Sequence, residues 1–211
     1  MTKSDLLDDL LSPQPAKVHH RPKRLMKVIR EAYAIGVPAF ALKSQTDRLG
    51  SSAGYAFHLG TPDDVLRRIC SWLLTNGEMN VLSGLIHELW KRYGREDVAL
   101  AGLLLANIYH DNGAWVRLAE IIGKQSTAEA LLLSIEECFR AKHAPPSEKL
   151  LLEWCTMSTA HAHLALLTKH ANWIRSGRPD LTKEIQSAFI EIQYPDGDSL
   201  LGRIRDQMLS S

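Results

Sequence analysis

The chain of 211 residues is 45% hydrophobic and 23% charged, which is the composition of an ordinary globular protein and excludes a fibrous or disordered chain. Its 25 Lys and Arg residues are nearly balanced by 24 Asp and Glu residues, so the net charge of +1 neither favours nor excludes a nucleic-acid partner. No run of about 18 apolar residues occurs, and we therefore expect no membrane-spanning helix and no membrane partner.

Residues 1–22 are expected to be an N-terminal segment, ordered or flexible, and residues 23–211 a single domain. Leucines at helical spacing in the segment predict a short amphipathic helix that stops at Ser12–Pro13–Gln14–Pro15. The chain turns acidic at Asp5 and lacks the apolar core of a signal peptide there. We therefore expect no secretory signal in this segment.

Helix signals are dense in the rest of the chain, whereas strand signals are nearly absent. Pro22 is predicted to open a helix that ends at Gly36, and Pro38 to open another. Residues 50–60 fit either a short helix or a loop. Thr61–Pro62–Asp63–Asp64 predicts a helix start with Thr61 as the N-cap. Further helices are expected near residues 81–89, 95–109, 112–123, 126–142, 147–156, 158–175, 180–193 and 197–209.

One pattern recurs along the chain: a tryptophan near the end of a helix, a turn and a glycine. It is clearest at Trp90–Gly94, where Lys91 and Arg92 complement the helix dipole and Gly94 is expected to take the left-handed conformation. It recurs at 173–177 and, more loosely, at 72–77. Repeated helix–turn–helix units predict an all-α fold, an α-solenoid of antiparallel helix pairs.

With its segments in this order, the chain resembles the DNA alkylation repair family over residues 23–195. Residues 36–43 are similar to the family's glycine–valine–proline helix start, and residues 89–105 to its Leu-Trp, turn and apolar helix unit. Residues 153–178 are similar to its late Glu-Trp, apolar helix and Arg-x-Gly unit. The resemblance implies a HEAT-like repeat array of the kind that alkylpurine DNA glycosylases use to hold duplex DNA.

The chain departs from that family at the positions that carry its chemistry. The glycosylases have a Trp and an Asp one helical turn apart, where this chain has Gln125 and Glu129, and an Arg pair where it has His163 and Leu164. Neither Gln nor His replaces an indole or a guanidinium like for like. If base excision is retained, Glu129 is the candidate catalytic acid. The alternative role of Glu129 is a capping box with Ser126.

Basic residues gather near the predicted C-termini of helices, and the corresponding ends of a repeat array share one edge. Dipole complementation, worth about 0.3–1 kcal/mol for each residue, is the competing explanation. If the edge binds DNA, the residues expected to contact phosphates are Lys91, Arg92, Arg95, Arg140, Lys142, His163, Arg175 and Arg178.

The densest positive block is His19–Arg24, with Lys27 and Arg30 beyond it. Two interpretations remain open for this block: an arm that contacts nucleic acid, or a solvated helix start whose charge is offset by the acidic residues of the first ten positions.

Other site types find no support in the sequence. The nine histidines lack metal-ligand spacing, no phosphate loop occurs, and no nucleophile has an evident partner, so we expect no metal, cofactor or nucleotide. Cys70, Cys138 and Cys155 fit buried reduced thiols, which predicts a cytoplasmic location. Tryptophans are expected in the core, and Trp115 is the one to test for exposure.

Three functions remain open. The preferred one is a DNA-binding HEAT-like relative of the alkylpurine glycosylases that lacks full glycosylase activity and is therefore not expected to be a full enzyme. The second is an α-solenoid scaffold that holds a protein partner on its concave face. The third is an intact glycosylase for alkylated bases. Salt-dependent DNA affinity, co-purification of a protein partner and release of alkylated purines separate them.

Overall fold

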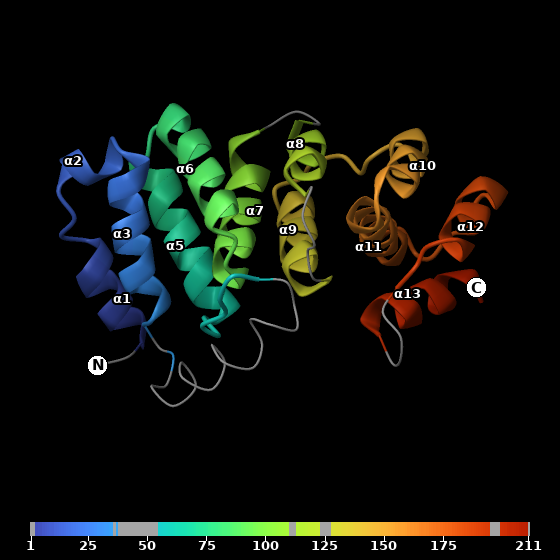
Figure 1. Ribbon diagram of the computed structural model, residues 1–211, viewed down its shortest axis with the longest axis horizontal. Coiled ribbons are helices and arrows are strands. Elements are labelled where there is room, and N and C mark those ends of the chain that lie inside the picture. The colour runs from blue at the N-terminus through green and yellow to red at the C-terminus, as the bar shows by residue number, and fades with distance from the viewer. Residues whose placement is uncertain are drawn as a thin grey trace. The chain divides into compact units, whose positions relative to one another are not determined.

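The computed structural model describes residues 3–35, 37, 55–109, 113–122, 128–194 and 199–210, and every regular element in those ranges is a helix. The predicted all-α character is therefore confirmed. None of the helices in these ranges has both the length and the apolar composition that a membrane crossing requires. The expected helix at Pro38 lies outside the described residues. Contacts divide the chain into two compact units, residues 1–108 and 109–211 (Figure 1).

The described part of unit 1 contains α1 (Lys3–Leu11), α2 (Ala16–His19), α3 (Pro22–Tyr33), α5 (Asp63–Asn76), α6 (Met79–Arg92) and α7 (Arg95–Ile108). Within this unit α7 packs against α5 and α6, and α3 packs against α6, so these four helices lie side by side (Figure 1). Both α1 and α2 pack against α3. The helices of residues 3–19 are thus packed against the helix that begins at Pro22.

The two predicted helix starts in unit 1 have different outcomes. Pro22 is the first residue of α3, as expected. Thr61 does not cap α5, because α5 begins at Asp63 after Pro62 and has no side-chain cap. The Thr61 hydroxyl instead donates to the backbone oxygen of Tyr33 at 2.9 Å. That bond ties the start of α5 to the end of α3.

Helix α7 is the core of unit 1, because almost every one of its residues is buried. The apolar run from Val98 to Leu105 makes this possible, since a helix that is hydrophobic all round belongs in an interior. Its first turn is also buried, although it consists of Arg95, Glu96 and Asp97. Three buried charged residues in one turn require polar partners from the surrounding segments.

The junction between α6 and α7 differs from its prediction. The left-handed residue is Tyr93 (φ 59°), and not Gly94. The Tyr93 ring is buried against Trp90 and Tyr55, with centroids 5.8 and 5.9 Å apart, and this packing offsets the backbone cost of a positive φ. Gly94 is required for another reason: any Cβ there would overlap the ring of Phe57.

Gly94→Ala is expected to lower the free energy of unfolding of the protein by about 1–3 kcal/mol, because the ring of Phe57 has to move out of a packed site. Urea unfolding followed by circular dichroism measures the loss. Gly84→Ala is the matched control, since its Cβ would meet only the Cγ atom of Pro22 at 3.2 Å. An equal loss in both variants would show that the Phe57 contact is not the constraint at Gly94.

The described part of unit 2 contains α8 (Gly113–Ile121), α9 (Ala128–Arg140), α10 (Glu148–Met157), α11 (Thr159–Arg175), α12 (Lys183–Ile190) and α13 (Leu200–Leu209). Helix α11 is its centre and packs against α9, α10 and α13. Trp115, Trp154 and Trp173 are buried, so Trp115 belongs to the core. Its indole N–H donates to the backbone oxygen of Ala144 at 2.8 Å.

Cys70, Cys138 and Cys155 form no disulfide, as expected for reduced thiols. Cys70 and Cys138 are buried and Cys155 is half-buried. Burial raises the pKa of Cys138 to about 12 and that of Cys155 to about 11. Both thiols therefore stay protonated near neutral pH and are poor nucleophiles.

Candidate anion-binding site

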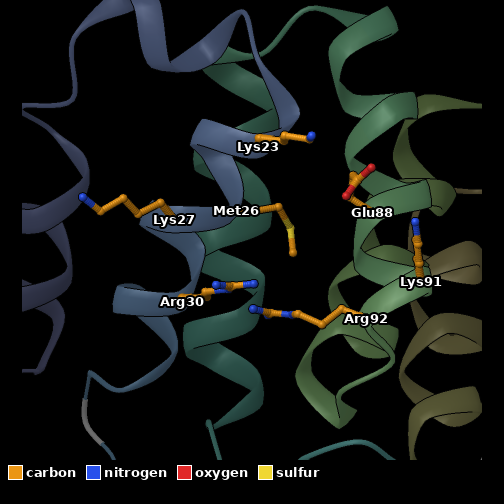
Figure 2. Close-up of a pocket in the computed structure, with 7 residues that line it drawn as sticks. All are labelled: Lys23, Met26, Lys27, Arg30, Glu88, Lys91 and Arg92. Atoms are coloured by element: carbon orange, nitrogen blue, oxygen red, sulfur yellow. The ribbon is translucent and has the colours of Figure 1, made fainter.

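A pocket of about 490 Å³ lies on unit 1 between α3 and α6 (Figure 2). Most of its lining side chains are cationic. The residues from α3 are Lys23, Met26, Lys27 and Arg30, and those from α6 are Glu88, Lys91 and Arg92.

Helical spacing explains how α3 presents its charges. Lys23, Lys27 and Arg30 are four and three residues apart, so they lie above one another on one face. The opposite face carries Leu25 and Ile29, which are fully buried. Packing of that apolar face therefore turns the basic face outward. Lys23 and Arg30 extend toward α6, whereas Lys27 extends away from it (Figure 2).

The pocket concentrates positive charge that the protein does not neutralise. Five cations and one carboxylate, Glu88, line it. Within the described part of the chain, no ion pair or hydrogen bond reaches the side chains of Lys23, Lys27, Arg30 or Lys91. An anion bound here would receive charge-assisted hydrogen bonds that these side chains otherwise make only with water.

Arg92 is the exception among the lining cations, because the protein holds its guanidinium in place. Its Nε and Nη2 atoms donate to the two carboxylate oxygens of Asp97. The guanidinium also lies over the rings of Phe57 and Tyr33, at 4.8 and 5.9 Å from their centroids. The side chain is only 19% exposed, yet it lines the pocket.

Asp97 is 0% exposed and has two further donors. The Tyr33 hydroxyl donates to its Oδ1 atom at 3.1 Å, and the backbone N–H of Gly94 to its Oδ2 atom at 3.3 Å. Burial, together with the Asp97 charge, raises the pKa of Tyr33 well above its ordinary value, so the hydroxyl keeps its proton and remains a donor. Asp97 also lies in the first turn of α7, where the helix dipole favours a negative charge.

Glu96 fixes the chain segment that precedes α5. Its Oε1 atom accepts hydrogen bonds from the backbone N–H groups of Leu59, Gly60 and Thr61, at 3.1, 3.0 and 3.3 Å. The carboxylate is fully buried, and within the described residues its Oε2 atom has no hydrogen-bond partner. One oxygen therefore satisfies three backbone donors and holds this segment against α7.

Arg95 is directed into unit 1 and is not at the pocket. Its Nη1 atom donates to the backbone oxygen of Thr61 and its Nη2 atom to Asp63, both at 3.1 Å. Its backbone N–H donates to the oxygen of Phe57 at 3.0 Å. Arg95 therefore also helps to hold the segment that precedes α5, and this segment carries the Phe57 ring over which the Arg92 guanidinium lies.

Glu96→Ala is expected to lower the free energy of unfolding by about 2 kcal/mol or more, because an unsatisfied buried donor costs about 1–3 kcal/mol. Glu96→Gln keeps an oxygen for the three N–H groups and is expected to lose less than half as much. Chemical unfolding of both variants measures the difference. Equal losses would show that the charge of Glu96, and not its accepting oxygen, holds the segment.

The structure does not bring the residues predicted to contact DNA together at one site. Lys91 and Arg92 line the pocket, whereas Arg95 is buried. In unit 2, His163 is also buried, and its Nε2 atom lies 2.7 Å from the backbone oxygen of Gln193. Glu129 belongs to α9, but its side chain is outside the described residues, as is Gln125.

The remaining candidates lie at helix ends of unit 2. Arg140 pairs with the buried Glu137, and Lys142 is exposed with a positive φ of 64°. Arg175 lies over the ring of Phe139 at 5.0 Å, and Arg178 over that of Trp173 at 5.5 Å. None of these four residues lines the pocket between α3 and α6.

Lys23, Lys27, Arg30 and Asp97 belong to the site but were not in the predicted DNA-binding set. Lys23, Lys27 and Arg30 were recognised only as part of a basic block, although their shared helical face was readable. Asp97 was not singled out. Its signal was a charged turn at the start of a helix that is otherwise apolar, which predicts burial of the charges with it.

Comparison of the chain with protein-family models, with curated proteins and with solved structures gave no match.

Proposed function

We propose that the chain binds nucleic acid, with duplex DNA as its ligand, and that the pocket between α3 and α6 holds the phosphate backbone. The observation that carries the proposal is the set of four cations on two facing helices that no group in the described residues neutralises. Phosphate neutralisation by Lys and Arg releases condensed counterions from DNA and supplies most of non-specific affinity. The proposal is for binding, and it includes no base-excision step.

The choice of DNA rests on the resemblance to the alkylation repair family and on the chemistry of the lining. A peptide or helix partner would need an apolar groove, whereas this pocket has five cationic lining residues around Met26 and Glu88. Lysines and arginines on one face are the feature by which nucleic-acid surfaces are recognised. We also propose that the helices form HEAT-like pairs, because the consecutive helices α6 and α7, and likewise α10 and α11, pack against each other.

Duplex DNA of random sequence is expected to bind with an affinity whose logarithm falls linearly with the logarithm of salt concentration. Lys27→Ala and Arg30→Ala are each expected to reduce the slope by about 0.9 for every phosphate that the variant no longer neutralises. Fluorescence anisotropy at several salt concentrations measures both quantities.

Arg21→Ala is the matched control, because Arg21 is exposed at the start of α3 and does not line the pocket. Its slope is expected to stay close to that of the unchanged protein. An equal reduction in the control would mean that general charge, and not the pocket, binds DNA. No binding at low salt, with capture of an acidic peptide instead, would contradict the proposed ligand.

A further inference from the structure

We propose that Arg92 recognises phosphate through directed hydrogen bonds, and that Asp97 and Tyr33 are positioning residues that hold its guanidinium for this contact. The inference rests on the proposed function, because it concerns the same pocket. In this proposal the other four lining cations attract the phosphate, and Arg92 recognises it through directed hydrogen bonds.

The donors of Arg92 divide between the protein and the pocket. A guanidinium has five N–H donors in a rigid plane. Asp97 takes the Nε donor and one from Nη2, and within the described residues no other group accepts from Arg92. Among the described residues, three donors, two on Nη1 and one on Nη2, are therefore left for a ligand. Two adjacent donors in one plane match two oxygens of a phosphate.

Arg92 can also make such contacts with little loss of side-chain freedom, because the protein already holds its guanidinium in place. Lys23, Lys27 and Lys91 are exposed and have no partner in the described structure, so each loses side-chain freedom on binding. The Arg92 guanidinium is already held by a carboxylate and two aromatic rings. Preorganisation of this kind lowers the entropic cost of association.

Charge balance separates the role of Arg92 from that of its neighbours. Asp97 neutralises Arg92 at the wall of the pocket, so the pair adds no net charge. The long-range attraction comes from the other four cations, which have no such partner among the described residues. Arg92 therefore contributes direction and geometry, while the salt dependence of binding belongs to the other four.

The opposite wall supplies a second guanidinium. Figure 2 shows Arg30 and Arg92 pointing toward each other, from α3 and α6, and both line the pocket. A guanidinium on each wall lets one anion accept hydrogen bonds from both sides. A phosphate at this position would accept hydrogen bonds from both walls. The position of Arg92 within such a site is set by Asp97, which is itself held by the Tyr33 hydroxyl.

The test uses Arg92→Lys, which keeps the charge and removes the planar donors. The probes are a short DNA duplex and inorganic pyrophosphate, each titrated by isothermal calorimetry at several salt concentrations. Arg92→Lys is expected to bind both probes about tenfold or more weakly, with the salt slope unchanged. Arg21→Lys is the matched exchange outside the pocket and is expected to change neither quantity.

Tyr33→Phe is the second variant, because it keeps the ring under Arg92 and the charge of Asp97 but removes one hydrogen bond. It is expected to weaken binding of both probes about threefold, the effect of one hydrogen bond on the position of Arg92. Thermal unfolding sets the temperature at which every variant is folded. If the hydrogen bond from Tyr33 to Asp97 only stabilises the fold, Tyr33→Phe lowers the unfolding temperature of the protein and leaves its affinity for both probes unchanged.

The outcomes separate this inference from the proposed function. If the unchanged protein binds DNA and both Arg92→Lys and Tyr33→Phe bind it equally well, the inference is wrong and the function stands. If the protein binds pyrophosphate with the expected losses but does not bind DNA, the proposed function is wrong and the inference stands. Binding of neither probe overturns both. If Arg92→Lys does not fold, the affinity of Tyr33→Phe decides.

Discussion

The carboxylate of Asp97 has no exposure to solvent, and a charge in that position is stable only where opposite charge and hydrogen-bond donors surround it. Arg92, Tyr33 and the backbone of Gly94 supply them from the end of α6, the end of α3 and the junction before α7. Removal of one partner from a buried pair is costly, about 3–5 kcal/mol, because the other charge remains. This carboxylate therefore fixes where α3 and α6 end relative to α7, and so fixes the two walls of the pocket.

The other two charges of the same turn extend this constraint to the segment before α5. Glu96 accepts three backbone N–H groups, and Arg95 donates to the oxygen of Thr61. The segment in turn presents Phe57 to the guanidinium of Arg92 and requires glycine at position 94. One buried charged turn thus links the core of unit 1 to the geometry of a surface site.

The helices are predictable from the sequence, whereas the site is predictable only in part. The apolar run 98–105 and Pro22 were sufficient for α7 and for the start of α3. The left-handed residue was placed at Gly94 instead of Tyr93, because local turn preferences cannot show that aromatic packing will hold a tyrosine there. The lysines of α3 and the cations of α6 are some sixty residues apart in the sequence, so only tertiary packing brings them to one pocket.

A crystal structure of the protein with pyrophosphate would show whether the Asp97–Arg92 pair organises the pocket for an anion. We expect pyrophosphate between Arg30 and Arg92, with the carboxylate of Asp97 on the opposite edge of the Arg92 guanidinium. An anion held by the lysines alone, or an Arg92 side chain turned away from Asp97 into solvent, would mean that the pair does not organise the pocket.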